Sequence, residues 1–209
     1  MTIAVLLAGL ALCAAQDSAA SDAAECRTPA AVNWREAATA DDRTRIRTGR
    51  DSWTAALDTV RARGGSAAVA SEGALLEPDR ALGSDPVPPA GDYRCRTIKL
   101  GIRDDSRAPV AVQPALPCRI AADGGLLRLT QAEGAQRVNG LLYPDTTSRG
   151  VFLGTLALTD EPTPLRYGQD RMRDMAGTVE RVAARRWRIV LPQPAFESTL
   201  DVIEVTPAG

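Results

Sequence analysis

The sequence predicts an α+β fold in which N-terminal helices are followed by an antiparallel meander of about eight strands, forming a small β-barrel or sandwich. Two patterns indicate this. In the first part of the chain, apolar residues recur at helical spacing, namely Ile46, Trp53, Leu57 and Val60. After a Pro-rich connector at 83–91, apolar residues alternate with a period of two, as is typical of half-buried strands.

The helical part has recognisable boundaries. Residues 39–42 (TADD) resemble a capping box with acidic residues in the first turn. Gly49 is expected to kink or divide the helix, and Gly64-Gly65 is expected to end it. A short second helix is predicted around 67–71, followed by a turn at 77–79.

The β part contains eight strand candidates. They lie near residues 93–101, 116–122, 125–132, 136–143, 150–159, 177–183, 186–191 and 200–205. Asp123-Gly124 is a hairpin signal between the second and the third. Trp187, Ile189 and Leu191 are predicted to share one face of their strand, whereas the last strand is apolar on both faces.

The N-terminus predicts export. Residues 2–15 (TIAVLLAGLALCAA) have the length of a signal h-region and are too short to span a bilayer. We expect a signal peptide at 1–15, a disordered lead-in at 16–33, a helical flank with its connector at 34–91 and a barrel-like region at 92–209, the last two forming one structural unit.

The predicted location is periplasmic or secreted, with no transmembrane span after signal removal. A lipoprotein anchored at Cys13 is the alternative. It is less favoured because Leu12 stands where a lipobox usually has Gly, Ala or Ser.

Three cysteines, Cys26, Cys95 and Cys118, remain after the signal. An oxidising compartment favours one bridge among them. We predict Cys95–Cys118, because an antiparallel pairing of 95 with 118 has its centre between Ser106 and Arg107, in the polar loop between two predicted strands. Cys26 is left free or available to another chain. The spacings are not those of a metal site.

Composition excludes several kinds of chemistry. The chain of 209 residues contains no His, which removes Ser-His-Asp and Cys-His catalysis and His-ligated zinc. The formal net charge is −1, so nucleic acid is not an expected partner. Among 25 basic residues Lys99 is the single lysine. We expect neither a cofactor nor a metal, since phosphate-binding glycine motifs are also absent.

Several short segments together resemble a known family. They are residues 93–96 (YRCR), 117–119 (PCR), 134–137 (GAQR), 152–154 (FLG), 167–170 (YGQD), 173–174 (RD), 177–181 (GTVER) and 187–188 (WR), with Trp34 and 45–46 (RI). This set resembles the domain of unknown function 4893 family of exported alphaproteobacterial proteins, over nearly all of the chain after the signal. Members often have Ser where this chain has Ala135. The resemblance implies export, supports the 95–118 bridge and implies no activity.

The segment 166–188 holds seven arginines and three acidic residues, which could bind a carboxylate, a phosphate or a sugar. The predicted ligand-binding residues are Arg96, Arg137, Arg173, Asp174, Glu180, Arg181 and Trp187. The competing interpretation is a structural ion-pair network with Trp187 in the core. Two carboxylates can also hydrolyse glycosides without His. For that chemistry the candidates are Asp170, Asp174 and Glu180, which could equally be salt-bridge partners of neighbouring arginines.

The sequence therefore predicts a non-enzymatic envelope binding module for a small anionic or sugar-like ligand or for a protein partner. The alternatives are a carboxylate-dependent hydrolase acting on envelope glycans and a purely structural envelope protein.

Overall fold

The computed structural model describes residues 32–159 and 161–209, which belong to one compact unit. The predicted signal peptide, Cys13, Cys26 and the lead-in up to residue 31 lie outside the described residues. Within the described ranges, no helix is both long enough and apolar enough to cross a membrane.

The helical flank has the predicted boundaries for its main helix, which divides as expected, and for the short helix that follows it, whereas α1 and the turn η1 were not predicted. Its elements are α1 (Trp34–Ala37), α2 (Ala40–Arg47), α3 (Gly49–Ala62), α4 (Ser66–Ala70) and the 3-10 turn η1 (Gly73–Leu75). The Thr39 hydroxyl accepts a hydrogen bond from the Asp42 backbone N–H at 3.1 Å, as the capping pattern predicts. The helix divides at Thr48, beside Gly49. Gly64, with a φ of 75°, ends α3 in the left-handed conformation that favours glycine.

The strands form a closed antiparallel barrel. They are β1 (Gly91–Leu100), β2 (Val110–Val112), β3 (Leu116–Asp123), β4 (Leu126–Gln131), β5 (Gln136–Pro144), β6 (Gly150–Leu158), β7 (Asp174–Ala183), β8 (Arg186–Pro192) and β9 (Leu200–Pro207). From β3 onward each strand pairs with the next, and β1 pairs with both β3 and β9, which closes the barrel. All eight predicted strands are confirmed. The three-residue β2, paired with the end of β1, was too short to predict.

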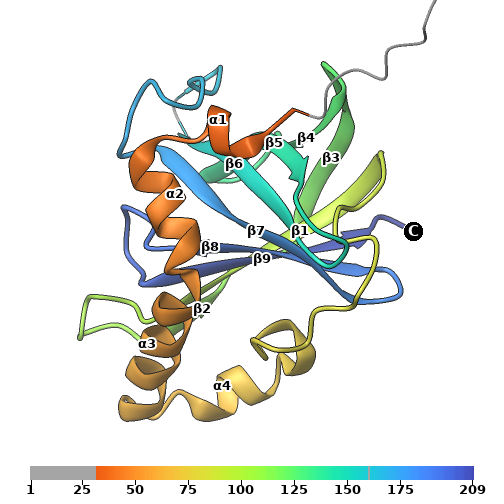
Figure 1. Ribbon diagram of the computed structural model, residues 1–209. Helices are drawn as coiled ribbons and strands as arrows, with labels where there is room; N and C mark the ends of the chain where they lie inside the picture. Colours follow the sequence, from red (N-terminus) through yellow and green to blue (C-terminus); the bar gives the residue numbers. More distant parts are fainter. Residues whose placement is uncertain (1–31, 160) are drawn as a thin grey trace, which may run out of the picture. The chain divides into compact units, whose positions relative to one another are not determined.

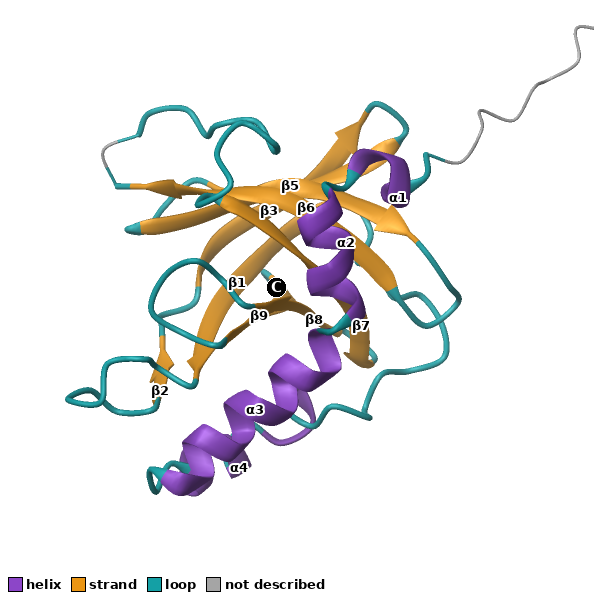
Figure 2. Cartoon of the chain, turned by 60° about the vertical axis from the view of Figure 1, so that its left-hand side comes forward, coloured by secondary structure: helices purple, strands orange, loops and turns teal. Residues whose placement is uncertain are grey.

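Alternation along the strands fills the barrel with apolar side chains. Trp187, Ile189 and Leu191 share the interior core, as predicted, with Phe152 and Ile203. The helices cover part of the outside (Figures 1 and 2). Two separate clusters hold them there. One joins Trp34, Ala38 and Ile46 to β5–β7, and the other joins Trp53, Ala56 and Val60 to β1, β8 and β9.

The Cys95–Cys118 disulfide is present, with a Cα–Cα distance of 5.8 Å. The predicted register was wrong by two residues, because Cys95 lies opposite Leu116 and Cys118 lies opposite Tyr93. The bridge therefore joins diagonal neighbours on the interior face. A shift of two preserves the face on which each side chain lies, and this is why the predicted bond forms in spite of the wrong register.

The connector closes one end of the barrel. Its Asp85 carbonyl accepts from the Trp187 indole N–H at 3.0 Å, and its Pro89 carbonyl accepts from the Tyr93 hydroxyl at 2.7 Å. At the other end, Lys99 and Asp201 form a buried ion pair of 3.1 Å. An internal cavity at that end measures about 10 Å³, room for one water at most. The barrel interior is therefore a packed core.

Candidate functional site

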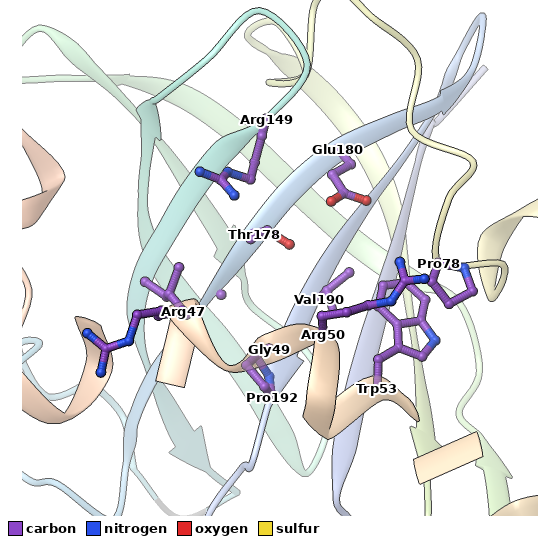
Figure 3. A pocket seen from close by; sticks show the side chains of 12 residues that line it. Arg47, Gly49, Arg50, Trp53, Pro78, Arg149, Thr178, Glu180, Val190 and Pro192 are labelled. Carbon is purple, nitrogen blue, oxygen red and sulfur yellow. The ribbon is translucent and has the colours of Figure 1, made fainter. Parts of the chain in front are cut away.

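The bend between α2 and α3 leaves part of the outer barrel face uncovered. Ile46, near the end of α2, packs on the β5–β7 side, whereas Trp53, in α3, packs on the β8–β9 side. A cavity of about 220 Å³, which we call the bend cavity, lies between the two helices and strands β7 and β8 (Figure 3). Gly177 lies in its wall, where a β-carbon would come within 1.8 Å of the Val190 carbonyl oxygen. Only glycine allows this approach of β7 to β8.

Three arginines are among the residues that line the bend cavity. Arg50 forms a two-point ion pair with Asp79, at 2.6 and 3.0 Å. Arg149, from the turn between β5 and β6, pairs with Asp145 at 2.6 and 3.0 Å. Arg47 forms no ion pair with any described carboxylate. Its guanidinium donates to the Thr44 hydroxyl at 3.3 Å and points away from Arg50 and Arg149 (Figure 3), so a turn of this exposed side chain is needed to bring its charge to a ligand in the cavity.

Glu180 contributes a carboxylate to the same wall, and a fully buried arginine neutralises it from behind. Arg188 donates from Nε and Nη2 to one Glu180 oxygen, at 2.8 and 2.7 Å. The Arg188 guanidinium lies 4.6 Å from the centre of the Trp53 ring, which adds a cation–π contact. The negative charge of Glu180 is thus compensated by Arg188 and not by the arginines that line the cavity.

The groups around the cavity have a net positive charge. The charged groups that line it and their direct ion-pair partners comprise four arginines (47, 50, 149 and 188) and three carboxylates (79, 145 and 180), which leaves one positive charge. Asp79 and Asp145 stay ionised at neutral pH. Burial would raise the pKa of Asp145, but hydrogen bonds from Trp34 and Arg149 lower it overall. The hydrogen bond from Arg50 lowers the pKa of Asp79.

These features suit a small anion. A volume of about 220 Å³ corresponds to roughly seven waters and is smaller than the cavities that hold drug-sized ligands. The Thr178 hydroxyl and the first turn of α3 also reach the cavity. Thr48 is both the C-cap of α2 and the N-cap of α3, so the opposite dipole ends of the two helices meet beside the cavity and the positive charge there comes from the arginines.

The predicted ligand-binding residues occupy separate parts of the barrel, and of these only Glu180 lines the bend cavity. Arg181 and Trp187 meet at the end closed by the connector, where both contact Asp85. At the opposite end Arg173 pairs with the Glu161 side chain at 2.8 Å, and Arg137 binds the Glu161 carbonyl.

Arg96 lies elsewhere again, between Glu72 and Glu204 on the outside of β1, at 2.6 and 2.8 Å. The geometry around these residues is that of separate ion-pair networks, with Trp187 in the interior core.

The candidate catalytic acids do not face one another. Asp174 and Glu180 lie six residues apart on one face of β7, a separation of about 20 Å, whereas glycosidase carboxylates lie roughly 5–9.5 Å apart. The Asp170 side chain accepts from the Met172 backbone N–H within its own turn. Asp174 is buried and accepts from the Gly168 N–H at 2.8 Å, and burial raises its pKa.

Sequence reasoning missed the arginines of the bend cavity. Arg47 and Arg50 flank the helix division at Gly49, and Arg149 lies about a hundred residues further along the chain. Two arginines three residues apart beside a helix break were the local signal. No group of three or more His, Cys, Asp or Glu within the described ranges has the arrangement of a metal site.

The fold and the cavity define a class of protein: a small closed β-barrel with a packed interior, an internal disulfide and a helical flank that shapes a cationic surface cavity. The family model described as domain of unknown function (DUF4893) matches residues 34–205, and the chain belongs to this family. No curated protein and no solved structure gives a significant match.

Proposed function

We propose that the protein is an exported, non-enzymatic binding module that takes a small anion, such as a phosphate or a carboxylate, in the bend cavity. The observation that carries this proposal is that Arg47 lines the cavity without an ion pair to a described carboxylate, and that the charged groups of the cavity and their direct partners sum to one positive charge. Arginine is well suited to such ligands because its planar fork binds their oxygens with two parallel hydrogen bonds.

Export is supported by the chemistry of the chain. A buried disulfide forms and persists in an oxidising compartment such as the periplasm. The apolar segment at 2–15 has the length of a signal h-region.

Native mass spectrometry of protein purified gently from the periplasm is the first test. A bound mass that disappears on denaturation would identify the ligand's class. Isothermal titration calorimetry with inorganic phosphate then measures binding at the site directly. A lost charge-assisted hydrogen bond is worth about 1.5–3 kcal/mol, so Arg47→Gln is expected to weaken phosphate binding by about tenfold or more.

The matched control is Arg61→Gln, which removes an exposed arginine from the far end of α3, outside the cavity. It should leave phosphate affinity unchanged at constant ionic strength. Equal losses in both variants would indicate general charge attraction. A clean apo mass together with no phosphate binding would refute the proposal and favour a structural role.

A further inference from the structure

A second cavity lies on the outer face of β4–β6, beneath the loop that precedes β7. This loop cavity measures about 490 Å³ and shares no lining residue with the bend cavity. The residues of its wall used below include Arg128, Asn139, Leu141, Thr155, Leu165 and Tyr167. Its volume falls within the roughly 300–1,000 Å³ typical of small-molecule sites, so it has room for a ring-sized ligand.

Thr155 supplies a hydroxyl that the protein itself does not satisfy. The residue is 3 % exposed, and its Oγ1 has no hydrogen-bond partner among the described residues. A buried polar group without a partner costs about 1–3 kcal/mol, and such groups are rare in folded proteins. Thr155 lines the loop cavity, so a rotation of its side chain toward the cavity would let a ligand hydroxyl provide the missing hydrogen bond.

Asn139 extends the polar surface across the neighbouring strand. It is the direct register partner of Thr155, so the two side chains lie side by side on one face of the sheet. Its Oδ1 accepts from Arg128 at 3.3 Å, while its amide N–H groups donate to no described residue. The charge of Arg128 is compensated by Asp123, at 2.6 Å.

The opposite wall is apolar and held in place. The Tyr167 hydroxyl donates to Asp42 and accepts from the Thr39 N–H at 3.1 Å, which fixes the ring beside the cavity. Leu141 and Leu165 also lie along the wall. Leu165 is 38 % exposed, which leaves apolar surface for a ligand to cover.

We propose that the loop cavity binds a neutral hydroxylated ring, such as a monosaccharide. The apolar face of the ring packs on Tyr167 and Leu165, and its hydroxyls exchange hydrogen bonds with Thr155 and Asn139. The ring hydroxyls meet uncharged donors and acceptors at the sheet surface, and Arg166, which also lines the cavity and forms no ion pair with a described carboxylate, can donate to a further ring hydroxyl. This site is independent of the anion site in the bend cavity.

The test is a titration of the ¹⁵N-labelled protein with glucose, N-acetylglucosamine and glucuronate, in which binding is detected from the NMR shifts of backbone amides. The binding variant is Thr155→Val, which keeps the volume of the side chain and removes an unpartnered hydroxyl, so it should unfold at the wild-type temperature or above. The matched control is Thr130→Val, the same change at the partner of Asn139 on β4, outside the cavity. A second variant, Leu165→Glu, places a charge on the exposed part of the apolar wall.

The expected result is a saturable shift of the Thr155 and Tyr167 amides with a neutral sugar. The affinity for the sugar should fall about tenfold or more in Thr155→Val and Leu165→Glu and should be unchanged in Thr130→Val. Three results would each overturn the proposal: no saturable shift with any of the sugars, equal binding by Thr155→Val, and binding of glucuronate alone. Failure of phosphate binding in the bend cavity would leave this result standing.

Discussion

Arg188 is a fully buried charged side chain that links three parts of the fold, and its replacement by Met gives the sharpest test of the packing described above. Besides its ion pair with Glu180, it donates to the carbonyls of Leu75, Glu77 and Pro78, at 3.0, 2.7 and 3.0 Å. These bonds hold the segment after α4 against the outside of β8.

The expected loss follows from what Met cannot replace. Arg188→Met retains much of the apolar volume but leaves the partly buried Glu180 without its cation and the segment carbonyls without a donor. Removing one partner of a buried ion pair costs about 3–5 kcal/mol, against a total stability of about 5–15 kcal/mol for a domain. We expect a loss of about 3–5 kcal/mol. Phosphate binding should also weaken, because Glu180 would then oppose it.

Urea unfolding followed by tryptophan fluorescence measures this loss. The control is Arg186→Gln on the same strand, because Arg186 is partly exposed and its partner Glu204 keeps its ion pair with Arg96. That change should cost less than about 1 kcal/mol. Glu180→Gln combined with Arg188→Met should cost less than the sum of the single changes, since no unpaired charge remains. A loss below about 1 kcal/mol for Arg188→Met would refute the assigned role.

Two further predictions concern stability. The disulfide links residues separated by 23 positions, so Cys95→Ala/Cys118→Ala should lower the free energy of unfolding by about 3 kcal/mol; a double variant as stable as wild type in urea would contradict this. Burial raises the pKa of Asp174 above its ordinary 3.8, so the folded state loses stability as the pH rises from 3.8 through the folded-state pKa. Asp174→Asn keeps the acceptor for Gly168 and removes the charge, so near pH 7 it should be at least as stable as wild type, an advantage that disappears below about pH 3.8. Urea midpoints at both pH values check this, and a variant less stable near pH 7 would count against it.

The strands were predictable because their signal is local. Alternation in segments such as 186–191 and the glycines after Asp123 specify strands and a hairpin without knowledge of the rest of the chain. The pairing of β1 with β3 was harder. The segment between β1 and β3 is not a simple turn. The first half of β1 pairs with β3 and its last residues pair with β2, and Gly101 turns the chain after β1 with a φ of 65°. A register inferred from the centre of the loop therefore misses by two residues.

The candidate site was less predictable than the strands, because its residues are brought together by the tertiary fold. Successive strand residues point to opposite faces, so the charged segment at 166–188 is divided by the sheet. Glu180 lies outside, beneath the helical flank, whereas the neighbouring Arg181 lies beside Trp187 at the connector end. The cavity that does form brings together residues from a helix boundary and a distant turn, and only the tertiary fold makes them neighbours.

The bend in the helix connects the fold to the proposed site. Residues 40–62 would extend about 35 Å as one straight helix. A straight rod that long cannot follow a curved barrel surface and bury both Ile46 and Trp53, which belong to clusters on different parts of it. Dividing the helix at Thr48 satisfies both clusters, and the bend cavity lies beside this division. Because the barrel interior is packed, hollows of this kind, formed where helices and loops cross the outer face, are where the fold offers room for a ligand.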